Sequence, residues 1–336
     1  MAQLAFSEYP TSCPLLYEWY NDKPDILYPS SASEDSPVTL GIGAVCDQGN
    51  YVVLASDKRV SYKNLQPNDE SGKAFDFAPL RLAGIAAGRV STMHDIISEM
   101  SVQFDKLATK RKGKPIYREH VENAIDDARV RQMARRYRHA ARINYNLTLK
   151  ELLMGKLPHG EMTALIWEDI KQKVFSLSLP AAVIVGGYVD DEPVLFKAEG
   201  KEHIQGDFDP PVFVIGSTGA SYAMEHLNRR GQNIFSSFAQ TVLHVHEAME
   251  IGRKKDHGGY IGRCDAYVVL HRQRQGFEQF PHNSPLLRSW VKAYAKRNST
   301  TSLKSGIAIN QAQFLLRSLE PGVRFERYRE KGKVAE

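Results

Sequence analysis

The sequence has few cysteines and no long hydrophobic run. Cys13, Cys46 and Cys264 are odd in number and widely spaced, so they build neither a disulfide framework nor a CxxC metal knuckle. Such cysteine usage fits a reducing compartment and predicts a cytoplasmic protein. The longest apolar runs are strand-sized, whereas a membrane helix needs about 20 residues. The N-terminus also lacks a basic region followed by an apolar stretch, so we expect no membrane segment and no secretion signal.

Motifs for nucleotides and metals are missing as well. The "GIG" of residues 41–43 lacks the third glycine and the following helix of a dinucleotide site, and no Gly-Lys-Ser/Thr phosphate loop occurs. His244 and His246 lie two residues apart on a predicted helix, so their side chains point to different sides. We therefore expect no cofactor and no metal.

The 336 residues, 42% apolar and 25% charged, suffice for a substantial core in one large domain or two small ones. We expect residues 1–37 to be a leader or extended arm, 38–272 the folded domain, and 273–336 a basic C-terminal extension. The net charge of +5 is unevenly distributed. A basic helical insertion is expected within the domain, at about residues 106–157.

The stretch that begins at Val38 has the pattern of a β-hairpin. Apolar residues alternate along the first strand, Gln48-Gly49-Asn50 forms the turn, and "YVVLAS" is the return strand. In this register Thr39 and Leu40 lie opposite Lys58 and Asp57. The hairpin therefore brings an acid to the end of the sheet where Thr39 begins.

Runs of strands and runs of helices alternate along the rest of the chain. Two strands in "KAFDFAPLRLAGIAAG" precede a helix with Ile96, Met100 and Phe104 on one face, and a charged helix follows from about Glu119 to about Ile143. Then come the strands "AAVIVGGY", "PVLFKAEG" and "PVFVIG", two helices within about 220–253, and the strand "CDAYVVLHR". This order predicts an α+β protein of antiparallel sheets with helices layered outside them.

Four motifs carry a family resemblance. "TLGIGAV", "DQGNYVVLASDKR", "SGKAFDF" and "IGSTGASYA" resemble, in order and spacing, the motifs of proteasome-type subunits of the N-terminal-nucleophile (Ntn) hydrolase superfamily. The similarity covers roughly Val38 to Leu270. It implies a four-layer αββα sandwich and a threonine-type peptidase. It also implies a ring of identical subunits, peptides or unfolded proteins as substrates, and an ATPase or activator as a further partner.

The resemblance also implies the site. It contains a threonine that opens the first strand, an aspartate that ends the second and a lysine that begins the third. A serine in a Gly-Ser-Gly-like turn and an aspartate before a Gly-Gly pair complete it. The matching residues here are Thr39, Asp57, Lys73, Ser217 and Asp256, with the backbone of Ala87 and Gly88 as oxyanion donors and His257 as a candidate accessory residue.

These residue types suit amide hydrolysis. A threonine hydroxyl is a poor nucleophile until a base takes its proton. The free amine of a terminal threonine, with a pKa of about 8, suits that task better than a lysine near about 10.4. Asp57 and Lys73 would then set the electrostatic field around Thr39. The chemistry therefore requires removal of the residues that precede Thr39.

Two departures from the family pattern support an alternative function. Val38 stands where self-cleaving members carry glycine, and a β-branched residue makes the strained turn at the scissile bond costly. His257 separates Asp256 from the Gly-Gly pair, and the serine of that motif is missing. The alternative is a catalytically inactive ring or scaffold subunit.

A third function and a second nucleophile are less favoured. The Arg129–Arg142 helix could follow a phosphate backbone, but aromatic residues hardly interleave with its arginines. We therefore favour a solvated or subunit-contacting helix and expect no nucleic acid.

Cys46 lies near the hairpin turn, far from Asp57, and is expected to be a small core residue.

Overall fold

The computed structural model divides the described part of the chain into two compact units. The small unit is formed by residues 133–177, and the large unit by the described residues before and after them. Both units together comprise residues 39–57, 60–62, 65–68, 73–78, 80–157, 160–161, 163–200, 212–216, 219–256, 261, 265–273 and 277–281. Within these ranges no helix combines the length and the apolar character needed to cross a membrane.

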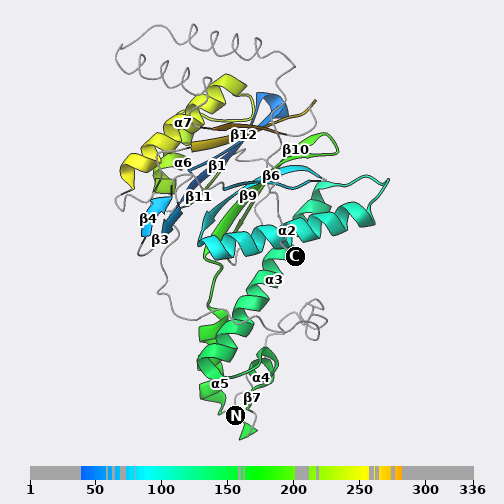
Figure 1. Cartoon of the computed structure of the whole chain (residues 1–336), viewed down its shortest axis with the longest axis vertical. Helices are drawn as coiled ribbons and strands as arrows, with labels where there is room; N and C mark the ends of the chain where they lie inside the picture. The colour runs from blue at the N-terminus through cyan, green and yellow to red at the C-terminus, as the bar shows by residue number, and fades with distance from the viewer. Residues whose placement is uncertain are drawn as a thin grey trace, which may run out of the picture. The chain divides into compact units, whose positions relative to one another are not determined.

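The first sheet of the large unit contains the predicted hairpin. It is antiparallel, with the strand order β11-β1-β2-β12-β13. Figure 1 labels β11, β1 and β12 of this sheet. The pairing of Gly41 with Ser56 is the predicted register, and the connecting turn places Gln48 and Gly49 at positive φ. The strands are β1 (Leu40–Cys46), β2 (Tyr51–Asp57), β11 (Val212–Gly216), β12 (Asp265–His271) and β13 (Phe277–Pro281), and the turn is η1 (Asp47–Gly49).

The second sheet is also antiparallel, with the order β10-β9-β6-β5. Its strands are β5 (Ala74–Asp76), β6 (Arg81–Gly88), β9 (Ala181–Val189) and β10 (Glu192–Glu199). A short separate hairpin joins β3 (Val60–Tyr62) to β4 (Leu65–Asn68). Two antiparallel sheets with helices place the chain in the α+β class, as predicted.

Apolar side chains fill three contact layers of the large unit. Val52 and Leu54 of β2 pack against Ile85 and Ile184 of the second sheet. Helices α6 (Gly219–Arg229) and α7 (Phe238–Lys255) cover the other face of the first sheet. Helix α2 (Val90–Lys110) packs on the second sheet, where the rings of Phe77 and Phe104 lie 5.0 Å apart. Each buried large side chain stabilises the fold by roughly 1.5–3 kcal/mol.

Helices α6 and α7 approach each other and β1 unusually closely. A Cβ atom at Gly219 would overlap the carbonyl group of Gly252, and one at Gly252 would overlap the side chain of Leu40. A side chain at Gly219 would displace backbone, and one at Gly252 would displace the buried Leu40 side chain. The two glycines therefore fix the helices above the first residues of β1.

The small unit has a core of its own. Leu147, Leu152 and Val174 belong to its buried cluster, and the indole Nε1–H of Trp167 donates to the carbonyl of Leu152 at 2.6 Å. A capping box begins α4, because the Thr148 side chain and Glu151 bond reciprocally. The unit contains the end of α3 (Arg118–Tyr145), α4 (Leu149–Met154), β7 (Lys156–Leu157), β8 (Gly160–Glu161) and α5 (Ala164–Phe175).

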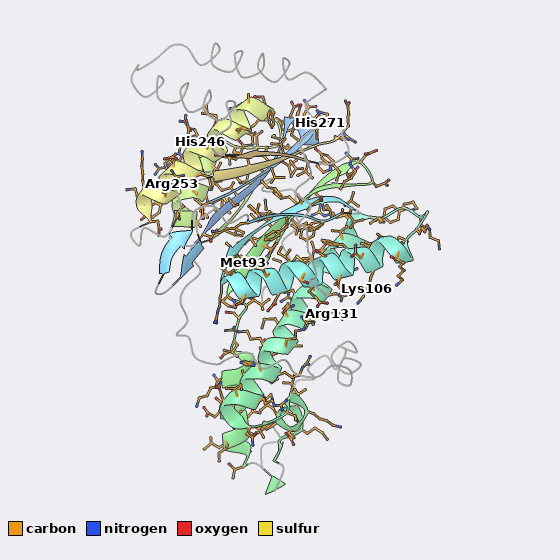
Figure 2. The ribbon with its side chains drawn as sticks, in the orientation of Figure 1. Met93, Lys106, Arg131, His246, Arg253 and His271 are labelled. Carbon is orange, nitrogen blue, oxygen red and sulfur yellow. The ribbon has the colours of Figure 1, made fainter. Side chains whose placement is uncertain are left out.

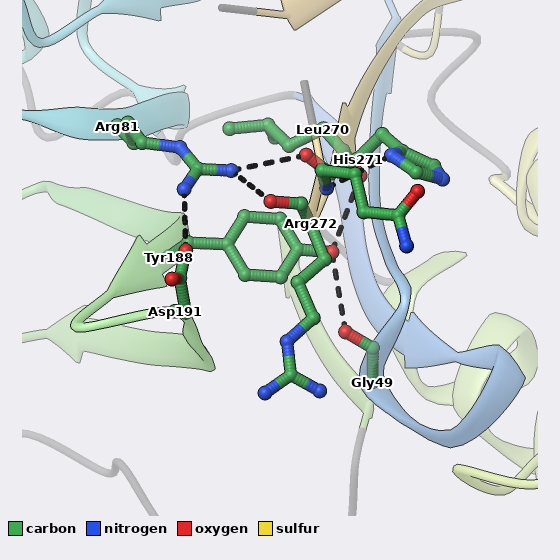
Figure 3. Close-up of polar contacts among 8 residues, drawn as sticks. Gly49, Arg81, Tyr188, Asp191, Leu270, His271 and Arg272 are labelled. Carbon is green, nitrogen blue, oxygen red and sulfur yellow. Dashed lines mark hydrogen bonds and ion pairs between the residues drawn. The ribbon is translucent and has the colours of Figure 1, made fainter. Parts of the chain in front are cut away.

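Polar contacts join the two sheets at the end where the β1–β2 hairpin turns (Figure 3). Arg81 of β6 donates to the carbonyls of His271 and Arg272 and pairs with Asp191 at 2.8 Å. Its guanidinium lies 5.1 Å from the ring centre of Tyr188. The Tyr188 hydroxyl in turn donates toward the carbonyls of Gly49 and Leu270, at 3.2 and 3.5 Å. We call these contacts the Arg81–Tyr188 clamp.

The clamp can be tested with Tyr188→Phe. The substitution keeps the ring but removes the donor for two buried carbonyls, so we expect the free energy of unfolding to fall by about 1 kcal/mol. Urea denaturation monitored by circular dichroism measures it. Tyr222→Phe is the matched control, because Tyr222 is 38% exposed on α6. Equal stability of the two variants would show that the Tyr188 hydroxyl does not support the clamp.

Candidate active site

Thr39, Asp57 and Lys73 meet in the structure. The Lys73 ammonium donates to Thr39 Oγ1 at 2.8 Å and to Asp57 Oδ1 at 2.7 Å. All three residues are buried, with exposed fractions of 2%, 0% and 2% in the order of the sequence. Three of the residues selected from the sequence thus form one hydrogen-bonded cluster.

Strand register places the acid beside the threonine. Because Gly41 pairs with Ser56, Leu40 lies opposite Asp57, and the Leu40 backbone N–H donates to Asp57 Oδ2 at 2.8 Å. The second carboxylate oxygen remains for Lys73. Asp57 therefore connects the start of β1 to a cation that comes from the second sheet.

Lys73 reaches the cluster from the residue before β5. The backbone N–H of Ala86 donates to the Lys73 carbonyl at 3.3 Å, which continues the β5–β6 pairing by one step. This bond fixes the origin of the lysine side chain relative to β6. The side chain then spans from the second sheet to the end of the first.

The cluster can lower the cost of charge on the threonine oxygen. A buried ammonium is costly unless it is paired, and Asp57 supplies that pairing. An ammonium has three N–H donors and no acceptor, so Thr39 Oγ1 receives a charge-assisted hydrogen bond. That bond stabilises a developing alkoxide, but the hydroxyl proton still needs a separate base.

Gly216 positions the Thr39 carbonyl, and the sequence reasoning did not select it. Gly216 pairs with Leu40 and has a φ of +136°. A Cβ atom there would overlap the carbonyl oxygen of Thr39, so only glycine allows β11 to approach so closely. Its signal in the sequence is the first glycine of "IGSTG", directly before Ser217.

The predicted oxyanion residues end the strand next to Lys73. Ala87 is 2% exposed and packs between the sheets, while Gly88 closes β6 with a φ of +132°. The Cα of Gly88 faces the backbone of Pro180 and Ala181, where a Cβ would overlap. Ala86, two residues before Gly88, donates its backbone N–H to the Lys73 carbonyl. This end of β6 therefore adjoins the cluster. The donor role of both backbones remains a prediction.

Asp256 lies at the end of α7. It is 7% exposed, and its Oδ2 accepts a hydrogen bond from the Ile261 backbone N–H at 2.9 Å. Ile261 itself packs with α6, α7 and β1 in the core, so this bond holds Asp256 on the same side of the first sheet. Ser217 and His257 lie outside the described residues.

Cys46, His244 and His246, for which the sequence predicts no catalytic or metal-binding role, lie in the core or contact its side chains. Cys46 is fully buried, and burial raises the pKa of its thiol to about 12. Nδ1 of His244 lies 2.9 Å from Gln232 Oε1. His246, which Figure 2 labels on α7, has its Nδ1 3.0 Å from the Tyr267 hydroxyl. Burial lowers the pKa of His246. Across the described ranges, no group of three His, Cys, Asp or Glu residues could hold a metal ion.

Two arginines of the basic helix form ion pairs within the large unit. Arg129 is only 9% exposed, and its Nη2 lies 2.7 Å from Asp126 Oδ1. Nε of Arg131 lies 3.8 Å from Oε1 of Glu99 on α2. These contacts connect α3 internally and to α2. They give this part of the Arg129–Arg142 helix a structural role.

Comparison with known proteins does not assign the chain to a family. No family model matches it, and no curated protein matches its sequence significantly. The geometry of the described residues therefore carries the functional argument.

The Asp57–Lys73 pair can be tested with Lys73→Met. This change removes the cation 2.7 Å from a fully buried carboxylate, so we expect the free energy of unfolding to fall by about 3–5 kcal/mol. Denaturant unfolding measures the loss. The double variant with Asp57→Asn removes both charges and should regain part of it. If the single and double variants lose the same stability, the pair is not coupled.

The raised pKa of Cys46 predicts an inert thiol. At pH 8 the buried thiol stays neutral, and the thiolate is the reactive form, so iodoacetamide should not modify Cys46 in the native protein. Peptide mass spectrometry after labelling gives the modified fraction, and the same reaction in denaturant is the control. Modification of Cys46 at equal rates in both conditions would contradict its burial.

Proposed function

We propose that this chain is an Ntn-type hydrolase with the four-layer αββα sandwich of that superfamily, and that it cleaves peptide amide bonds with Thr39 as nucleophile. The residues before Thr39 must first be removed. One observation carries the proposal: the Lys73 ammonium bonds both the Thr39 hydroxyl oxygen and the Asp57 carboxylate in a buried cluster. The layers of α6 and α7, two sheets and α2 are consistent with the sandwich.

Stability of the core alone does not explain why a buried lysine–aspartate pair contacts a threonine. A buried ion pair is at best weakly stabilising compared with apolar residues of similar volume. Here the shared ammonium also aims a donor at a hydroxyl that can serve as nucleophile. Strongly coupled charges around such a hydroxyl are typical of catalytic sites.

In the proposed reaction Thr39 Oγ1 attacks the substrate carbonyl carbon. The new α-amine of Thr39 accepts the hydroxyl proton, and Lys73 stabilises the oxygen as it loses that proton. The carbonyl oxygen becomes an oxyanion, for which backbone N–H groups at Ala87 and Gly88 are the proposed donors. The C–N bond then breaks, the amine proton passes to the leaving nitrogen, and water hydrolyses the resulting ester.

Removal of the preceding residues has two roles in this proposal. In the continuous chain the nitrogen of Thr39 is an amide, which is no base at working pH. Thr39 is also only 2% exposed, so a peptide substrate could not reach its hydroxyl. Cleavage after Val38 creates the amine, and the proposal requires that it also expose the hydroxyl. The proposal further includes the expected context, a cytoplasmic ring of identical subunits supplied with peptides or unfolded proteins by an ATPase or activator.

The experiment is peptide hydrolysis by a chain that begins at Thr39, produced by a protease site placed directly before it. We expect the cleaved protein to hydrolyse fluorogenic peptides and Thr39→Ala to reduce kcat/KM by about 10³-fold or more. Thr39→Ser keeps a hydroxyl and an amine and should retain turnover. The uncleaved chain should be inactive.

The same samples distinguish the inactive alternative. An electrophile that captures both the amine and the hydroxyl of a terminal threonine should label the cleaved wild type and not Thr39→Ala. If the cleaved protein neither hydrolyses peptides nor reacts with this probe while its fold is intact, the hydrolase proposal fails. The scaffold function would then be the better account.

A further inference from the structure

The small unit exposes much of its apolar surface. Leu165 is 84% exposed, Met154 56%, Ile166 53% and Leu153 47%. Nine large apolar side chains are exposed among the described residues, and five of them lie in this unit, since Ile143 is the fifth. Exposed apolar side chains that gather in one part of a protein are typical of a surface that binds a partner.

Helices α4 and α5 carry four of these exposed side chains. Leu153 and Met154 end α4, and Leu165 and Ile166 begin α5. The bond from the Trp167 indole to the Leu152 carbonyl ties these two helix ends together. We call the four residues Leu153, Met154, Leu165 and Ile166 the α4–α5 patch.

The small unit is also strongly basic. Residues 133–177 contain eight lysines and arginines against four acids, a net charge of +4, whereas the whole chain has +5. A partner of the α4–α5 patch should therefore combine apolar side chains with negative charge.

A segment of this chain has that composition. We infer that residues 1–38 dock on the small unit through the α4–α5 patch. The segment contains six acids and one lysine, a net charge of −5, and the apolar stretches "LLYEWY" and "ILY". Its tyrosines, tryptophan and leucines can cover the patch, while its acids oppose the basic side chains.

Net charge favours residues 1–38 over the other possible partners of the α4–α5 patch. A second copy of the small unit would place +4 against +4, and residues 282–336 contain eleven basic and four acidic residues. Both carry the same sign as the small unit and would be repelled. Nucleic acid has the right sign, but phosphates give no burial to Leu165 and Ile166.

The inference goes beyond the proposed function and does not rest on it. Docking of residues 1–38 on the small unit holds the segment that precedes Thr39, whether or not Thr39 becomes a nucleophile. In either case it predicts that the segment stays bound after the chain is cut. The two ideas therefore fail in different experiments.

The test uses the full chain with a protease site inserted between Ser33 and Glu34. After cleavage under reducing conditions, gel filtration measures the fraction of the N-terminal fragment that co-elutes with the remainder. We expect retention at low salt and weaker retention at high salt, since ionic screening reduces the charge contribution. The variant Leu165→Glu with Ile166→Glu should lower the affinity about tenfold or more.

Phe235→Glu is the matched control, because Phe235 is 75% exposed and lies in the large unit. It should retain the fragment like the wild type. Immediate release of the fragment from the wild type, or equal retention by the patch variant, would overturn the inference.

A second measurement avoids any dependence on folding of the patch variant. A photo-crosslinking residue at position 166 should capture peptides from residues 1–38, and one at position 235 should not. Capture of a peptide from any other part of the chain would favour a second copy and would refute docking of this segment.

Discussion

The site depends on one buried carboxylate. Asp57 accepts the backbone N–H of Leu40 with one oxygen and the Lys73 ammonium with the other. A carboxylate that is fully buried must have such partners, because an unpaired buried charge costs several kcal/mol. The need to pair this carboxylate therefore holds together the start of β1, the end of β2 and the residue before β5. Thr39 takes its position from these contacts and from the close approach of Gly216 to its carbonyl.

The part of this arrangement that could be predicted is local in sequence. Alternating apolar residues and one turn set the β1–β2 register, and this register alone brings Asp57 opposite Leu40. Lys73 follows Asp57 by 16 residues, and the family resemblance identified it. The helices that became α2, α3, α6 and α7 were also predicted, because each shows an apolar face or a long charged run.

The contacts that could not be predicted involve backbone carbonyl groups, which leave no pattern in the sequence. The Arg81–Tyr188 clamp bonds to backbone carbonyls, and every residue type supplies such an acceptor. The contact of Gly216 with the Thr39 carbonyl has the same character. Helix α4 falls within the predicted helical insertion but was not recognised as a separate helix of six residues. Helix α5 was missed because it presents Leu165 and Ile166 outward, which blurs its apolar face.

The side-chain hydrogen bonds of the Thr39 cluster and those of Arg81 differ in the chain length that they close. The Thr39 cluster joins residues at most 34 positions apart, whereas Arg81 reaches His271 and Arg272 across 190 and 191 positions. Closing a long loop costs more chain entropy, and non-local contacts slow folding. The hairpin and its charged cluster can thus form while the later strands are still unfolded. We therefore expect the docking of β12 beside β2, which completes the Arg81–Tyr188 clamp, to follow formation of the hairpin.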